Sequence, residues 1–121
     1  MADEPATESP AFIALDAMRR KLAAVEGRKQ GVFQFELTGN EVGDFALEVD
    51  DRREVKLITG KSERTPRNLV TGDGRKIRRV LEGELDAATA FLSGGIQFRG
   101  DVRYLEHLLR ELKLQKPRKQ A

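Results

Sequence analysis

The 121-residue sequence contains no cysteine and a single histidine. Without cysteine it has no disulfide bonds, thiolate nucleophiles or thiolate metal sites, and this composition fits a reducing compartment. The sequence also lacks an apolar run of membrane-spanning length. Its first residues, MADEPATESP, are polar and acidic and lack the apolar core of a signal peptide. We therefore expect a cytoplasmic protein.

Residue patterns for catalysis are absent too. The single histidine, His107, lies about 150° around the expected last helix from its leucine stripe and so faces solvent. No spacing matches a calcium loop, a zinc site or a phosphate-binding loop. No serine or threonine has a histidine partner in a known arrangement. The sequence therefore predicts a protein without catalytic residues, metal site or cofactor.

The sequence has little excess of positive over negative charge. Its net charge is only +2, although 35% of the residues are charged. Such a balance is typical of a well-solvated surface and not of a protein that coats nucleic acid. The length predicts one domain. We expect a disordered segment over residues 1–9, a folded domain over 10–114 and a basic tail over 115–121.

Five stretches have the alternation of apolar and polar residues that indicates strands. They cover residues 32–37, 45–49, 55–59, 68–72 and 96–99. The first three form an expected meander with one apolar and one wet face. The apolar face would carry Phe33, Phe35, Leu37, Phe45, Leu47, Val49, Val55 and Leu57. The opposite face would carry Gln34, Glu36, Ala46, Glu48 and Lys56.

Helices are predicted to follow Ser9, Asp73, Asp86 and Asp101, four side chains suited to N-caps. The first helix has its apolar stripe at Ala11, Leu15, Met18, Leu22 and Val25. The second carries Ile77, Val80 and Leu81, and the third ends at Gly94-Gly95. The last has an apolar face of Val102, Leu105, Leu108, Leu109 and Leu112. The expected fold is α+β, a five-stranded, mainly antiparallel sheet covered on one face by helices.

The stretch FLSGGIQFRGDVRYLEHLLREL, residues 91–112, resembles the C-terminal signature of the sterol carrier protein type 2 family. That signature has a short helix ending in glycine, a strand with a basic residue, Gly-Asp and a final amphipathic helix. The spacing Gly83, Phe91, Gly94, Gly100-Asp101 carries the similarity, which extends back through the earlier strands. The chain resembles the bacterial-type, single-domain members, and its last residues, Lys119-Gln120-Ala121, are not the peroxisomal tripeptide of many eukaryotic members.

The resemblance implies an apolar tunnel between sheet and helices that accepts fatty acyl chains, acyl-coenzyme A, sterols or phospholipids. It also implies non-catalytic lipid binding, and transfer, or the holding of an isoprenoid intermediate as in some bacterial relatives. The apolar residues assigned to ligand binding are Phe33, Phe35, Leu47, Leu57, Phe91, Leu92, Ile96, Phe98, Leu105, Leu108, Leu109 and Leu112.

The apolar pattern by itself favours a filled core, since every domain needs such residues. Periodicity does not distinguish a cavity from a filled core, whereas the resemblance favours the cavity. The alternative function is a protein–protein interaction module without ligand, which would use the last helix and a basic face.

Positive charge is concentrated between Lys61 and Val80, where seven basic residues accompany two acidic ones. The simplest interpretation is a solvated face. A functional interpretation is docking to anionic membrane lipid through Arg75, Lys76 and Arg79, and contact with coenzyme A phosphates is another. Nucleic acid is not expected as a partner, because no aromatic residues are interleaved with the cations for base stacking.

Overall fold

The computed structural model describes residues 9–39 and 41–115, without the side chains of Ala87, Ala88, Leu109 and residues 112–115. The expected segment 1–9, apart from Ser9, and the expected tail, apart from Gln115, lie outside these residues. The elements in chain order are α1 (Pro10–Ala23), β1 (Gly31–Thr38), β2 (Gly43–Val49), β3 (Val55–Thr59), β4 (Asn68–Asp73), α2 (Gly74–Leu81), α3 (Ala87–Leu92), β5 (Ile96–Gly100) and α4 (Val102–Gln115).

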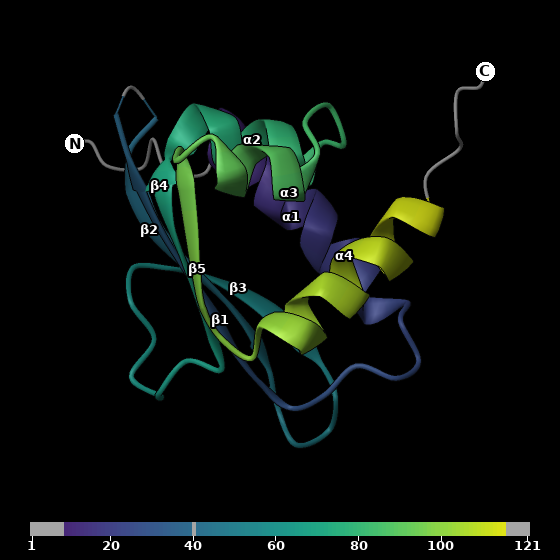
Figure 1. Cartoon of the computed structure of the whole chain (residues 1–121). Coiled ribbons are helices and arrows are strands. Elements are labelled where there is room, and N and C mark those ends of the chain that lie inside the picture. The colour runs from purple at the N-terminus through teal and green to yellow at the C-terminus, as the bar shows by residue number, and fades with distance from the viewer. Residues whose placement is uncertain (1–8, 40, 116–121) are drawn as a thin grey trace.

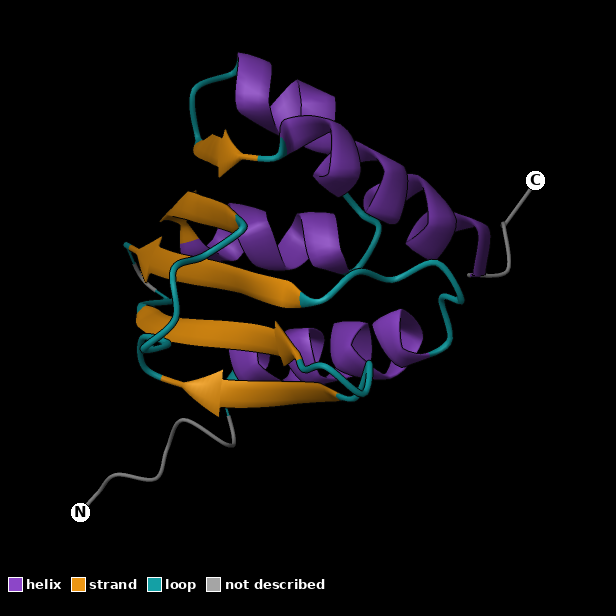
Figure 2. Ribbon diagram, turned by 90° about the horizontal axis from the view of Figure 1, so that it is seen from below, coloured by secondary structure: helices purple, strands orange, loops and turns teal. Residues whose placement is uncertain are grey.

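The five strands form one sheet in the order β3-β2-β1-β4-β5. Consecutive strands β1, β2 and β3 pair antiparallel, as does β4 with β5, whereas β1 and β4 pair parallel. Helices gather on one side of this sheet (Figures 1 and 2). The α+β class and the mainly antiparallel sheet are therefore confirmed.

The inward face of the sheet carries the residues that alternation assigned to it. Phe33 pairs with Leu47 and Phe35 with Phe45, so these rings and side chains point to the same side. Val55 and Leu57 continue the same face on β3 and pack partly buried against the core. The charged residues Glu36, Glu48 and Lys56 lie on the opposite face, as predicted.

The outer face of the sheet is less exposed to solvent than the sequence predicted. Gln34 is only 3% exposed, and Val32 and Ala46 are buried as well. Strand β3 lies at one edge of the sheet, and β2 and β1 separate it from β4. The residues that connect β3 to β4 therefore cross these two strands and cover their outer face. Gln34 Nε2 donates a hydrogen bond to Gly60 O (3.2 Å), and Gln34 Oε1 accepts one from Ser62 N (3.0 Å). Strand alternation does not reveal such a cover, because it reports the pleat and not what lies above it.

The helices begin where the capping residues predicted. Ser9 Oγ accepts a hydrogen bond from Phe12 N at 3.0 Å, with Pro10 at the first helical position. Asp73, Asp86 and Asp101 cap α2, α3 and α4 in the same way. Each cap satisfies a backbone N–H that a helix leaves without an internal partner.

Helix α4 differs from its predicted apolar face at its first turn. Val102 is 46% exposed, whereas Tyr104, Leu105 and Leu108 are buried. Strand β5 is at the edge of the sheet, so the first turn of α4 has no further strand to cover it. The rings of Tyr104 and Phe33 stack with centroids 6.0 Å apart, and this contact joins α4 to the middle of the sheet.

Candidate functional site

An apolar cavity lies between the inward face of the sheet and the covering helices. Its volume is about 20 Å³, room for roughly one water-sized sphere. The described residues around it are all apolar, and they come from both layers: Met18 of α1, Phe35, Val70, Ile96 and Phe98 of the strands, Ile77, Val80 and Leu81 of α2, and Leu105 of α4. An apolar cavity of this kind offers no hydrogen bonds to water and suits an apolar guest.

Four of the residues assigned to ligand binding line this cavity, namely Phe35, Ile96, Phe98 and Leu105. Four others, Phe33, Leu47, Leu57 and Leu108, belong to the surrounding core. Phe91 and Leu92 are exposed by 49% and 81% and lie outside the cavity. The side chains of Leu109 and Leu112 lie outside the described residues. Whether these residues bind a ligand stays a prediction.

The sequence reasoning missed five lining residues. Ile77, Val80 and Leu81 lie on one face of α2, and Met18 belongs to the apolar stripe of α1. The pattern predicted both apolar faces but did not show which part of the inward face each helix covers. Val70 could have been found from alternation in β4, where it follows Asn68 by two positions and so shares its face.

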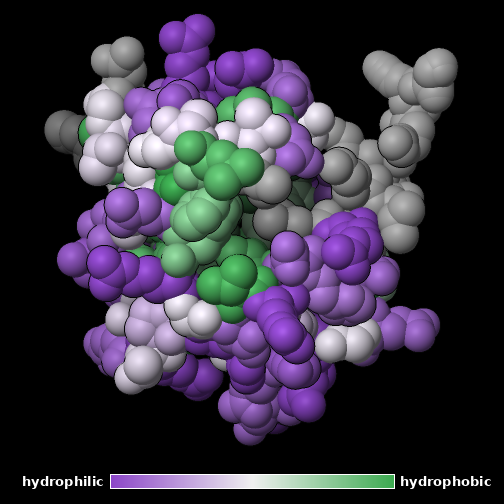
Figure 3. All heavy atoms as spheres, viewed as in Figure 1, coloured by the Kyte–Doolittle hydropathy of each residue, from purple (hydrophilic) through white to green (hydrophobic). Residues whose placement is uncertain are grey.

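Phe98 connects the cavity to the surface. Its ring lines the cavity on one side and stacks on Phe91 on the other, with centroids 5.8 Å apart. Exposed Phe91 and Leu92 of α3, together with Val102 of α4, form what we call the apolar patch. Figure 3 shows apolar atoms gathered on this face of the molecule. Exposed groups of large apolar side chains are uncommon on soluble proteins and mark contact surfaces.

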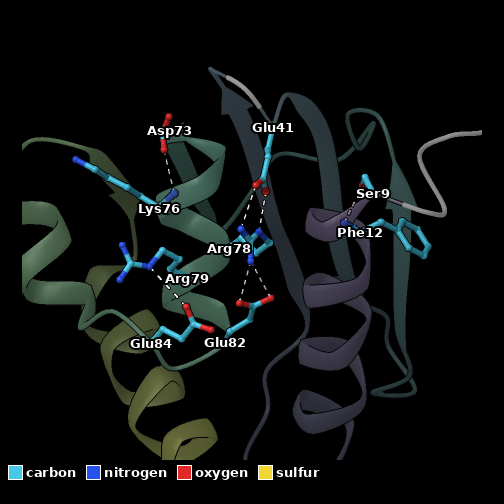
Figure 4. A network of polar contacts seen from close by, with 9 residues as sticks. All are labelled: Ser9, Phe12, Glu41, Asp73, Lys76, Arg78, Arg79, Glu82 and Glu84. Carbon is cyan, nitrogen blue, oxygen red and sulfur yellow. Dashed lines mark hydrogen bonds and ion pairs between the residues drawn. The ribbon is translucent and has the colours of Figure 1, made fainter.

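Helix α2 is held against the β1–β2 connection by a network of ion pairs around Arg78 (Figure 4). Its guanidinium donates two hydrogen bonds to the Glu41 carboxylate, at 2.8 and 3.1 Å, and two to the Glu82 carboxylate, at 3.0 and 3.3 Å. The hydrogen bonds to Glu41 raise the pKa of Arg78, as do those to Glu82, although partial burial opposes the shift. Gly74 brings the helix close, since a Cβ there would lie 1.8 Å from Glu41 O.

The predicted docking residues lie on α2. Arg75 is exposed and has no ion pair with any described residue, whereas Arg79 pairs with Glu84 at 3.6 Å. The side chain of Lys76 extends over Gly95, where a Cβ would lie 2.7 Å from Nζ. Elsewhere in the basic segment Lys61, Arg67 and Arg78 form ion pairs. The positive charge of the segment is therefore partly neutralised.

Within residues 9–39 and 41–115, no cluster of His, Cys, Asp and Glu side chains is arranged to hold a metal ion. His107 is exposed on α4, as the sequence predicted. None of the helices in the described part of the chain combines the length and the hydropathy needed to cross a membrane.

The fold and the position of the cavity can now be compared with known proteins. The sequence profile of the SCP-2 sterol transfer family matches residues 12–113. The chain belongs to this family. A comparison with curated proteins finds no individual match. The recognition made from residues 91–112 is therefore confirmed.

Solved structures of the SCP-2 type share the fold of this chain at low identity. The sterol carrier protein domain 2 of Helicoverpa armigera is 17% identical over 98% of this chain and 99% of that chain, with a TM-score of 0.71. Sterol carrier protein 2 of Aedes aegypti, solved in complex with palmitate, is 15% identical over 85% and 94%, with a TM-score of 0.67.

The same fold occurs inside a larger enzyme. The inverting sec-alkylsulfatase Pisa1 from Pseudomonas sp. is 17% identical over 93% of this chain but only 18% of that chain, with a TM-score of 0.68. An SCP-2 fold can therefore be a part of an enzyme.

Proposed function

We propose that this member of the SCP-2 sterol transfer family binds a long apolar ligand between its sheet and its helices, and carries it between donor and acceptor. The wholly apolar cavity bounded by Phe35, Val70, Leu81, Phe98 and Leu105 is the observation that carries the proposal. Each methylene group transferred from water into such surroundings contributes about 0.8 kcal/mol. No catalytic step is needed, and we propose that this chain acts without one, in the cytoplasm.

A long acyl chain needs far more room than about 20 Å³, so binding must separate the helices from the sheet. Helix α4 is suited to move away from the sheet. Its backbone lies close to the backbone of α1 at several residues, but it lies close to the backbone of the strands at only a few. Phe98 lines the cavity and stacks on Phe91 of the apolar patch, so this pair joins the two. We infer that the ligand passes at this pair. Separation of the two rings would open the cavity toward the exposed apolar surface.

The ligand classes we propose are fatty acyl chains, acyl-coenzyme A, sterol-like molecules and isoprenoids. Support comes from the palmitate bound by the Aedes aegypti relative, which shares the fold. Denaturing the purified protein and analysing the released molecules by mass spectrometry would identify a natural ligand. If no lipid is released and no lipid probe binds, the interaction module without ligand becomes the better interpretation.

A tryptophan at position 81 tests the cavity directly, because the chain has no tryptophan of its own. Leu81 is half-buried and lines the cavity, whereas Leu69 is half-buried on β4 and lies on the opposite face of the sheet from the lining residue Val70. Leu81→Trp occupies ligand space worth about two methylene groups and should weaken binding of a fluorescent fatty acid by roughly tenfold. Leu69→Trp is the matched control and should leave binding within about twofold.

Tryptophan emission provides a second measurement in the same variants. Palmitate should change the emission of the tryptophan in Leu81→Trp and leave that in Leu69→Trp unaltered. Equal responses of the two variants, in affinity or in emission, would contradict the proposed location of the ligand.

We also propose that α2 meets anionic lipid surfaces through Arg75, Lys76 and Arg79. Arg75 and Arg79 are one helical turn apart on an exposed face, which supports this role. Each basic side chain near an anionic bilayer contributes about 1 kcal/mol, and salt weakens the attraction.

Vesicle sedimentation tests the docking surface. The double variant Arg75→Glu/Arg79→Glu should bind vesicles containing phosphatidylserine at least about tenfold more weakly than the original chain. Arg52→Glu/Arg64→Glu changes the net charge equally at exposed positions elsewhere and should bind as the original chain does. If both double variants lose the same vesicle affinity, the net charge of the protein and not this face of α2 determines binding. If the original chain binds vesicles with and without phosphatidylserine equally well, the docking proposal is wrong.

A further inference from the structure

Asn68 is the one inward-facing polar side chain that the core of the described residues encloses next to the cavity. It is 1% exposed and stands on β4 two positions before the lining residue Val70. The row of Phe35, Val70 and Phe98 borders the cavity, and the next row along the strands is Phe33, Asn68 and Gly100. Adjacent rows of one face are about 6.5 Å apart. The carboxamide therefore lies beside the apolar cavity, under the first turns of α4.

The nitrogen and the oxygen of the Asn68 carboxamide differ in their hydrogen bonding. Nδ2 donates hydrogen bonds to two backbone carbonyls, Asp101 O at 2.9 Å and Arg99 O at 3.3 Å. These two acceptors fix which end of the amide is nitrogen. Oδ1 is fully buried and has no hydrogen-bond donor among the described residues. An unsatisfied buried acceptor costs about 1–3 kcal/mol and is rare in native proteins.

The side of Asn68 that faces β5 is closed by backbone. Its β5 neighbour in the same row is Gly100, and a Cβ there would lie 2.1 Å from Arg67 O and 3.1 Å from Asn68 Cα. Above the row, Tyr104 stacks on Phe33, and the Tyr104 hydroxyl is engaged as acceptor from Lys29 N at 2.6 Å. Leu105, one position further along α4, lines the cavity. A ligand that lifts α4 from the sheet therefore reaches Oδ1 from the cavity.

We propose that Asn68 Oδ1 accepts a hydrogen bond from the head group of the ligand, and that the ligand class is a neutral, long apolar molecule ending in a hydroxyl group. This inference rests on the proposed function and names the chemistry of the ligand's polar end. A hydroxyl donates the missing hydrogen bond, whereas an ether or an ester offers only acceptors and leaves Oδ1 unsatisfied. A site with a buried polar group that needs its partner discriminates strongly against an analogue lacking it.

Two isomeric probes isolate the hydrogen bond. Hexadecan-1-ol and 1-methoxypentadecane have the same atoms, but only the alcohol can donate. Displacement of a fluorescent fatty acid gives the affinity of each for the original chain and for Asn68→Leu. The ratio of alcohol affinity to ether affinity should be about tenfold higher in the original chain than in the variant. An unchanged ratio would overturn the role of Asn68.

Nuclear magnetic resonance of the unaltered chain keeps the inference testable if Asn68→Leu fails to fold. The sequence has only two asparagines, so the side-chain amide signals of Asn68 are readily assigned. Hexadecan-1-ol should shift the Asn68 Nδ2 signals, and the ether should not, while the backbone amide of Val70 responds to both. If the Val70 signal shifts but the two isomers shift the Asn68 Nδ2 signals equally, this inference fails and the proposed function stands. If neither isomer displaces the probe or shifts Val70, the proposed function fails, and this inference with it.

Discussion

Arg78 shows how a single side chain sets the position of a whole wall of the cavity. It lies on α2 between the half-buried carboxylates of Glu41 and Glu82, with only 20% of its side chain exposed. A guanidinium can donate to two carboxylates at once in a fixed plane, which an ammonium cannot. Because the pKa of Arg78 is raised, the guanidinium keeps its charge at every pH below its ordinary pKa.

We predict that Arg78→Leu lowers the free energy of unfolding by about 2 kcal/mol, because it leaves two partly buried carboxylates without a partner. Arg79→Leu removes one exposed ion pair of 3.6 Å from the same helix and should cost less than about 0.5 kcal/mol. Urea denaturation followed by circular dichroism measures both. Similar losses would mean that α2 is not held by the Arg78 network.

At the scale of elements, β4 joins the two parts of the sheet. It pairs parallel with β1 on one side and antiparallel with β5 on the other. At its end Gly72 has a φ of +144°, and a Cβ there would lie 2.3 Å from Gly95 O and 2.9 Å from Ile96 Cα. Only glycine fits such a position, because both the backbone angle and the neighbouring strand exclude a side chain.

Gly72→Ala should therefore destabilise the protein by about 2–4 kcal/mol, since the β4–β5 pairing must shift to admit the methyl group. Gly27→Ala is the control, because Gly27 lies in a loop with open space around its Cα and no unusual φ. It should change stability by less than about 0.5 kcal/mol. Thermal unfolding followed by circular dichroism compares the two, and a neutral Gly72→Ala would show that the β4–β5 edge yields easily.

At the scale of the whole molecule, the cavity exists because three helices meet the sheet at one place. Met18, Ile77 and Leu105 come from α1, α2 and α4 and face the same strands. A larger cavity would therefore lower the stability of the protein. Each side-chain atom removed from this contact costs packing energy and increases the cavity volume that a ligand can occupy.

We predict that Leu105→Ala lowers the free energy of unfolding by about 2–5 kcal/mol and enlarges the cavity. Leu108→Ala should cost a similar amount, because Leu108 is equally buried on α4, but it does not line the cavity. A saturating fatty acid should raise the melting temperature of Leu105→Ala by more than that of Leu108→Ala, because a ligand fills only the space it can reach. Equal ligand-induced shifts in differential scanning calorimetry would contradict this location.

Much of the fold was predictable from local chemistry. Capping residues such as Ser9 and Asp101 marked the helix starts, and alternation in β1 and β2 placed Phe33 and Leu47 on the inward face. The outer face was mispredicted at Gln34, because burial there depends on a segment almost thirty positions further along the chain. The cavity residues of α2 were missed for the same reason.

The sequence by itself determined the elements, the inward face and the family, because caps, periodicity and the Gly-Asp signature are local properties of the chain. Tertiary structure alone decided which helix covers which strand. It therefore decided that Ile77 and Leu81 border a cavity, that Phe91 lies outside it, and that Asn68 keeps a buried oxygen without a donor among the described residues. The physical reason is that cavities and unsatisfied groups arise where distant segments meet, and the spacing of residues along one segment carries no record of that meeting.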